Sequence, residues 1–203
     1  QARFGLKLYP GIDLAGDPGP ACGPGLVFVD PADATSTAIA DTLAMANTSS
    51  GTPPAEALDS LIGYQPLLDP TRNNYILLIT DGQSNCADPV PVVASVLAQT
   101  PSVRTFVVGF GSGVDPTELN DMAQAGGTAQ PMMPYYFQAD DAAALGAAFA
   151  TIVGSVLSCS YALNEIPPDP NQLYVWIDGV LVPADPTNGW VYDPVTNQIN
   201  FVG

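Results

Sequence analysis

NNYILLITDG, residues 73–82, decides the fold class of this chain. The apolar run over residues 75–79 contains no alternating polar residue, which is typical of a central strand of a parallel sheet that is buried on both faces. Asp81 follows the run, so the sequence predicts a carboxylate at the carboxyl edge of the sheet, where open α/β folds bind their ligands. Gly82 allows a sharp turn out of the strand.

Helical and strand-like patterns alternate after this stretch. Residues 91–99 are predicted to form a short helix, residues 103–110 are a second apolar and β-branched run, and Asp115 opens another helix. Residues 135–138 are predicted as a short strand before a long helix that starts near Asp140. This alternation predicts right-handed βαβ crossovers, and therefore an α/β fold with a doubly wound, mostly parallel sheet and helices on both faces.

The N-terminal part is predicted to contain two strands and a helix. Residues 2–9 alternate polar and apolar side chains, which indicates a half-exposed strand near a sheet edge. Residues 26–29 form a short strand, and Asp30-Pro31 is a turn signal. Asp33 is the expected N-cap of the following helix, whose Leu43 is expected to face the core.

The pattern changes at Cys159. No helical periodicity follows it, and residues 174–182 and 190–202 form two hairpin-like units, the first turning at Asp178-Gly179. The sequence therefore predicts a small antiparallel β module of about 40 residues, too small to be stable without packing or a staple. We expect an N-terminally incomplete first domain at residues 1–158 and a truncated β-rich module at residues 159–203.

The composition excludes several classes of function. The 203 residues include 20 acidic and 4 basic side chains and no histidine, which gives a net charge of −16. Such a surface repels phosphate groups, so we expect neither nucleic-acid binding nor electrostatic membrane binding. The apolar helix near residues 142–157 is too short and too interrupted for membrane insertion. Without histidine, Ser-His-Asp and Cys-His catalysis are excluded, and GFGSG at residues 109–113 lacks the lysine of a P-loop, so no enzyme is predicted.

The three cysteines, Cys22, Cys86 and Cys159, form no CxxC pair, which argues against a zinc site. Their loop positions and the low lysine content favour a secreted or cell-surface protein, in which Cys22 and Cys86 would form a disulfide. The alternative is three buried thiols in a cytosolic protein. For Cys159 we expect a partner cysteine beyond residue 203; the alternative is a free thiol at the end of the long helix.

Thr80-Asp81-Gly82 after an apolar strand resembles the von Willebrand factor A domain, the fold of integrin I domains, whose metal-ion-dependent adhesion site uses this aspartate. SSGTPPAEAL at residues 49–58 resembles the loop and helix that carry the metal-site threonine, here Thr52. RTFVVGFG at residues 104–111 resembles the next core strand. The three motifs occur in the order of the family, and the resemblance covers about the first three-quarters of the chain.

The resemblance implies that three loops bind one divalent cation, Mg²⁺, Mn²⁺ or Ca²⁺. Thr52 and Asp81 match two of these loops; as alternatives, Thr52 is an ordinary N-cap with Pro53 at the first helical position, and Asp81 caps only its own turn. The third loop, Asp-x-Ser-x-Ser, is absent, since neither Asp13 nor Asp33 gives its pattern. We expect about 30 to 40 missing upstream residues, one strand and one helix, or a strand supplied by another chain, so cation binding depends on an upstream loop.

Two functional hypotheses follow from the resemblance. The first is an extracellular adhesion domain that binds a protein or surface ligand through the cation at Thr52 and Asp81. The second is a metal-free structural subunit of a surface assembly or filament, completed by a strand from a neighbouring chain. An empty central strand position leaves backbone hydrogen bonds unmade, so the 203 residues are not expected to fold stably alone.

Overall fold

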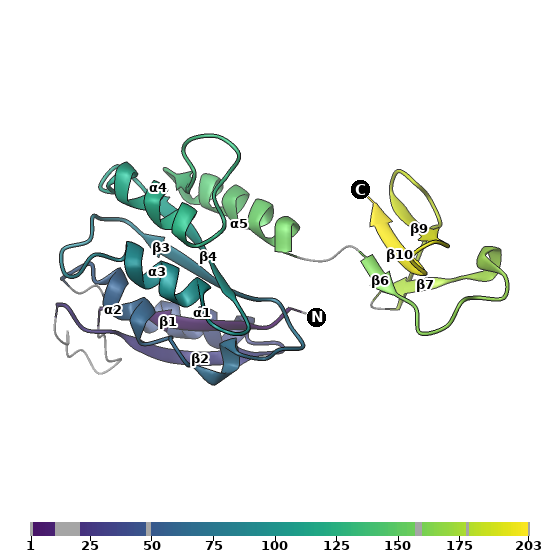
Figure 1. Ribbon diagram of the computed structural model, residues 1–203, viewed down its shortest axis with the longest axis horizontal. Helices are drawn as coiled ribbons and strands as arrows, with labels where there is room; N and C mark the ends of the chain where they lie inside the picture. The colour runs from purple at the N-terminus through teal and green to yellow at the C-terminus, as the bar shows by residue number, and fades with distance from the viewer. Residues whose placement is uncertain (1, 11–20, 48–49, 157–159, 178, 203) are drawn as a thin grey trace. The chain divides into compact units, whose positions relative to one another are not determined.

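The computed structural model describes residues 2–10, 21–47, 50–156, 160–177 and 179–202 (Figure 1). The chain divides into two compact units, Gln1–Val153 and Gly154–Gly203, and each is described by itself. Asp13 and Cys159 lie outside the described residues, so the external disulfide expected for Cys159 stays a prediction.

The first unit contains a three-stranded parallel sheet in the order β3-β4-β5. Its strands are β3 (Asn74–Thr80), β4 (Val103–Phe110) and β5 (Phe137–Ala139). β4 lies in the middle and pairs in parallel with both neighbours. The parallel sheet predicted from the alternation of helices and strands is confirmed.

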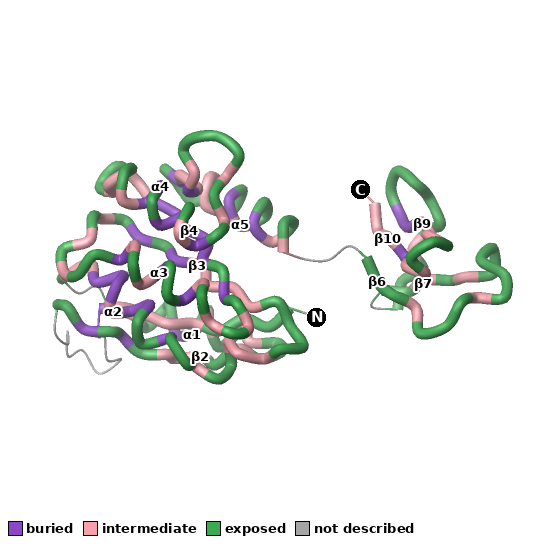
Figure 2. Tube along the Cα trace, viewed as in Figure 1, coloured by how far each residue is buried: buried purple, intermediate pink, exposed green. Residues whose placement is uncertain are grey.

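Five α-helices and a short 3-10 helix accompany this sheet in the described part of the first unit. They are α1 (Ser36–Met45), α2 (Pro54–Asp59), η1 (Gln65–Leu67), α3 (Val90–Leu97), α4 (Pro116–Ala125) and α5 (Ala142–Val156). The core forms where α3 and α4 pack on β4 and α2 packs on α3, and Figure 2 shows buried residues along these elements. Its fully buried side chains include Leu58, Val96, Val107 and Leu119.

β1 (Phe4–Leu8) and β2 (Leu26–Ala32) form a separate antiparallel pair. The turn predicted at Asp30-Pro31 is wrong, because β2 continues through both residues. Pro31 fits because Gly5 of β1 lies against it: a Cβ on Gly5 would lie only 2.9 Å from the proline Cδ. The pairing register shifts at this point, as is common where a sheet edge accommodates proline.

α1 differs from its prediction in two ways. Asp33 does not cap it: the N-cap is Thr35, and Asp33 lies 3.4 Å from the Arg3 guanidinium in an ion pair. Leu43, expected in the core, is 51% exposed, and Thr42 is the buried residue of the helix. The described residues therefore leave part of the apolar surface of α1 uncovered.

β3 contains the predicted run, residues 75–79, and extends it by one residue at each end, but its burial differs from the prediction. Among the described residues it pairs only with β4, so it lies at the edge of its sheet. Leu78 and Thr80 are buried, whereas Ile79 is 38% exposed. The prediction of a strand buried on both faces is therefore wrong at Ile79.

The second unit is the predicted antiparallel β module. β6 (Ser160–Ala162), β9 (Gly189–Asp193) and β10 (Gln198–Val202) form a sheet in the order β6-β10-β9; β7 (Val175–Ile177) and β8 (Val180–Val182) form a hairpin, and η2 (Pro170–Gln172) is a 3-10 turn. Trp190 is 4% exposed and donates a hydrogen bond from Nε1 to the Val182 carbonyl, 3.0 Å away. This bond links the two sheets. The two hairpins were predicted, and β6 was not.

Candidate functional site

Two predicted site residues lie in loops that meet at the carboxyl edge of β3. Asp81 is the first residue after the strand, and its side chain is exposed. Thr52 lies in the loop before α2, and its hydroxyl oxygen is 3.3 Å from the position that a Cβ on Gly82 would occupy. The structure therefore places the Thr52 hydroxyl against the residue that follows Asp81.

Thr52 is held in this place by Asn85, which sequence reasoning missed. The Thr52 backbone N–H donates to the Asn85 side-chain oxygen at 2.9 Å, and the Asn85 N–H donates to the Thr52 carbonyl at 3.2 Å. The alternative role of Thr52 as an N-cap is wrong: the N-cap of α2 is Pro53 and the helix begins at Pro54. The Thr52 hydroxyl is therefore not used to start the helix.

A disulfide joins the same region to the segment before β2. Cys22 and Cys86 are bonded at an S–S distance of 2.01 Å, so this predicted disulfide is confirmed. Next to it, Gly51 has a φ of +106°, and a Cβ there would lie 2.2 Å from the Ala21 carbonyl oxygen. Only glycine allows this close approach, which fixes the Thr52 loop against the cysteine-containing segment.

The neighbouring carboxylates have structural partners. Glu118 Oε1 accepts hydrogen bonds from the Ser84 N–H at 3.2 Å and from the Ser84 hydroxyl at 2.7 Å. Asp115 accepts from the N–H of Thr117 at 2.8 Å, as the N-cap of α4, and from the Gln83 amide at 3.2 Å. These two acids hold the loop after β3 against α4, while Asp81 stays exposed at the edge.

Tyr9, directly after β1, also reaches this edge. Its hydroxyl donates a hydrogen bond to the Ile79 carbonyl oxygen at 3.0 Å. Burial raises the pKa of Tyr9 from 10.0 to about 12; a hydrogen bond with the Thr80 side chain opposes this shift, and the charge of Asp81 adds to it. Tyr9 is thus a neutral donor at physiological pH, and it was not predicted as a site residue.

The described donors suit part of a metal site. A threonine hydroxyl and a carboxylate are the hard oxygen ligands that Mg²⁺, Mn²⁺ and Ca²⁺ prefer. Within the described ranges, however, no group of three or more His, Cys, Asp or Glu side chains could hold a metal ion. A cation at Thr52 and Asp81 would need most of its roughly six ligands from water or from residues outside these ranges.

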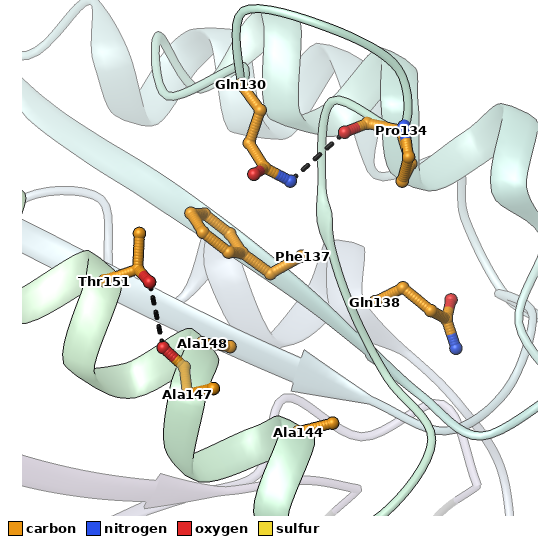
Figure 3. A pocket seen from close by; sticks show the side chains of 8 residues that line it. All are labelled: Gln130, Pro134, Phe137, Gln138, Ala144, Ala147, Ala148 and Thr151. Carbon is orange, nitrogen blue, oxygen red and sulfur yellow. Dashed lines mark hydrogen bonds between the residues drawn. The ribbon is translucent and has the colours of Figure 1, made fainter.

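A hollow of about 370 Å³ lies elsewhere, between β5, α5 and the segment before β5 (Figure 3). Its polar side chains are already paired: Gln130 donates to the Pro134 carbonyl at 3.1 Å, and Thr151 donates to the Ala147 carbonyl at 2.9 Å. The remaining lining is largely alanine and contains no charged side chain. This hollow therefore offers no group for acid–base or metal chemistry.

Comparison with solved structures gives several similar chains, and the three described here have low identity. A von Willebrand factor type A protein from Catenulispora acidiphila has a TM-score of 0.50 and 17% identity over 87% of this chain and 42% of its own. Proximal thread matrix protein 1 from the mussel byssus has a TM-score of 0.41 and 20% identity over 58% of this chain and 28% of its own. The same mussel protein with a zinc-occupied MIDAS motif has a TM-score of 0.47 and 19% identity over 64% of this chain and 31% of its own. The chain thus spans less than half of each of these chains.

Comparison with curated protein sequences gave no match. In the described part of the chain, no helix has the length and apolar character needed to cross a membrane. The family model of the von Willebrand factor type A domain matches residues 35–151, more than half of the chain. Domains of this family are generally non-enzymatic binding or structural domains. This chain belongs to the von Willebrand factor type A domain family.

Proposed function

We propose that the first unit is an extracellular adhesion domain that binds a protein or surface ligand through a divalent cation at Thr52 and Asp81. The observation that carries this proposal is the placement of the Thr52 hydroxyl beside the residue after Asp81, at the carboxyl edge of β3. Asn85 and the Cys22–Cys86 disulfide support it, because they fix the two loops relative to each other.

The chemistry of these ligands favours an acidic partner. A cation bound by one hydroxyl and one carboxylate keeps most of its positive charge, so it attracts a further carboxylate from a ligand. The disulfide and the 4 basic residues in 203 support a secreted or cell-surface location. In this proposal residues 159–203 are a second domain.

Manganese binding tests the cation site. Electron paramagnetic resonance of free Mn²⁺ measures its affinity for the 203-residue chain and for the variants Asp81→Asn and Thr52→Val. Both variants are expected to weaken binding by about tenfold or more, since even the loss of a group that only supports a metal ligand weakens binding about 10- to 100-fold.

Asp121→Asn is the matched control, because it removes the same charge from an exposed position on α4. It should leave the affinity of the site unchanged. Equal Mn²⁺ affinities for the Asp81 and Asp121 variants would contradict the proposal.

A second candidate is a metal-free structural subunit of a surface assembly or filament, completed by a strand from a neighbouring chain. One observation favours it: within the described residues, β1 and β3 each pair on one side only. The two candidates differ in chelator sensitivity. Assembly that persists in EDTA supports the structural candidate, whereas binding that EDTA abolishes supports the adhesion candidate.

A further inference from the structure

The second unit contains a hollow of about 500 Å³. Its lining includes the buried Trp190, the half-buried Leu173 and Tyr192, and three exposed prolines, Pro170, Pro186 and Pro194. The hollow is therefore built from aromatic and other apolar rings. Its volume lies within the range of about 300 to 1,000 Å³ that is usual for ligand pockets.

Each of the three prolines directly follows an aspartate. The carboxylates of Asp169, Asp185 and Asp193 each accept a hydrogen bond from the backbone N–H two residues later, at 3.0, 2.7 and 2.9 Å. These bonds fix the turns that contain the prolines. A hydrogen bond from the Thr196 hydroxyl lowers the pKa of Asp193, so this carboxylate is charged at neutral pH. Three carboxylates are thus held one residue from the lining.

The polar atoms of the lining are already paired within the unit. Trp190 Nε1 donates to a backbone carbonyl at 3.0 Å, and the Tyr192 hydroxyl donates to Asn197 Oδ1 at 2.9 Å. The Asn171 amide donates to Asp169 at 3.1 Å. A ligand recognised through hydrogen bonds, such as a sugar or a nucleobase, would find these donors in use. The lining is therefore poorly suited to such a ligand.

Asp185 differs from the other two aspartates in its second oxygen. Its Oδ1 accepts both hydrogen bonds of the turn, from the N–H groups of Thr187 and Asn188 at 2.7 and 3.1 Å. Within the part of the unit that the structure describes, no donor bonds to its Oδ2. In Asp169 and Asp193, both oxygens accept hydrogen bonds. A charged acceptor is thus left over beside Pro186.

The unit itself supplies no positive charge to these carboxylates. Residues 154–203 contain five acidic side chains and no lysine or arginine. A wholly apolar occupant would cover the aromatic rings, but it would take the nearby carboxylates out of water without compensation, which is unfavourable. An occupant that has both an apolar stem and a positive charge complements both parts of the hollow.

We propose that the hollow binds an arginine side chain carried by a basic polypeptide partner. A guanidinium is planar, so it stacks on aromatic rings and donates to a carboxylate at the same time, here to Asp185 Oδ2. The hydrocarbon stem of the arginine packs against the prolines. The proposal concerns the second unit alone, and it does not require the cation proposed for the first unit.

A fluorescence titration of the Trp176→Phe variant tests the proposal, because Trp190 is then the only tryptophan in the 203 residues. The exchange is conservative, since Trp176 is 62% exposed. The probe is a seven-residue peptide with blocked ends in which alanine and arginine alternate, and EDTA is present throughout. We expect the emission of Trp190 to change and to saturate as the peptide is added.

Two further peptides define what is recognised. Citrulline keeps the shape of arginine but carries no charge, so a peptide with citrulline in place of arginine should bind about tenfold more weakly or worse. A peptide with lysine keeps the charge but lacks the planar group. It should bind several-fold more weakly than the arginine peptide.

A pair of variants, made in the Trp176→Phe chain, locates the charge. Asp185→Asn keeps a side-chain oxygen for the turn, so the fold is retained, and it should lower the affinity for the arginine peptide about tenfold. Glu165→Gln is the matched control, because it removes the same charge from an exposed residue that neither lines the hollow nor adjoins a lining residue. It should leave the affinity unchanged. Circular dichroism verifies that both variants are folded.

Four results would overturn the proposal. Equal affinities for the arginine and citrulline peptides, or no change in the emission of Trp190, would exclude recognition of a positive charge in the hollow. An equal loss of affinity in Asp185→Asn and Glu165→Gln would indicate a general attraction to the acidic unit. Equal affinity for the lysine peptide would exclude the assignment to arginine. Because EDTA removes divalent cations, failure of Mn²⁺ binding leaves these outcomes unchanged, and the two proposals can fail separately.

Discussion

β3 and β4 are neighbours in one sheet and have apolar sequences of similar length, but their surroundings differ. β4 pairs on both sides, and β3 pairs on one side among the described residues. Ile79 of β3 lies opposite Val108 of β4, and their side chains are 38% and 0% exposed. The difference shows that the burial of a strand depends on its neighbours as well as on its own composition.

Among the variants that test the difference between β3 and β4, the one without the Cys22–Cys86 disulfide is expected to lose the most stability. The bond joins the segment before β2 to the loop after β3 and spans 64 residues. A loop of this size is expected to contribute about 4 kcal/mol to the free energy of unfolding. Urea denaturation of the oxidised chain and of the Cys22→Ser/Cys86→Ser variant measures it. A decrease of less than about 1 kcal/mol in the free energy of unfolding would mean that the other contacts of this region hold it in place without the disulfide.

Shortening the side chain of Ile79 or of Val108, which lie opposite each other, is expected to give the second-largest loss of stability. Val108→Ala removes two buried methyl groups and should lower the free energy of unfolding by about 2 kcal/mol. Ile79→Ala removes more carbon but should cost only about 1 kcal/mol, because its side chain is partly exposed already. Urea denaturation of both variants checks this order. A larger loss for Ile79→Ala would show that the free side of β3 is covered in solution.

Tyr9→Phe gives the smallest effect and tests the connection between β1 and β3. The loss of one hydrogen bond should cost about 0.5 to 1.5 kcal/mol at neutral pH. The pKa of Tyr9 is raised from 10.0 to about 12 in the folded chain, so folding favours the protonated phenol. Its contribution to stability is therefore complete below pH 10 and is lost as the pH rises toward 12.

Urea denaturation between pH 8 and pH 12 should show the difference between Tyr9→Phe and the original chain narrowing above pH 10. The comparison of the two proteins is needed because the pKa of Tyr64 is also raised to about 12, mainly by burial, and Tyr64 is present in both. A constant difference over this range would contradict the role given to the Tyr9 hydroxyl.

The sequence predicted those parts of the fold that depend on residues close together in the chain, such as a strand-forming run or a helix N-cap. The bounds of β4 agree with its apolar, β-branched run, and Asp115 caps α4 as its position before Pro116 indicates. The burial of β3 could not be predicted in the same way, because it depends on a neighbour that no feature of β3 specifies. The turn at Asp30-Pro31 was wrong because the glycine that accommodates Pro31 lies on another strand.

For the candidate site, too, only part of the arrangement could be predicted from the sequence. The Cys22–Cys86 pairing was predicted and is confirmed, whereas the metal roles of Thr52 and Asp81 stay predictions. Asn85 and Tyr9 were missed because their bonds span 33 and 70 residues. Contacts over such separations leave no periodicity or spacing in the sequence that could have revealed them.

The reciprocal hydrogen bonds between Thr52 and Asn85 have a consequence for the thermodynamics of recognition. A loop that is already ordered in the free protein has little conformational entropy left to lose when a ligand binds. The Thr52 loop is fixed in this way by two bonds to Asn85 and by its contact with Ala21. Association at this edge therefore carries a small ordering cost, and more of the contact energy appears as affinity.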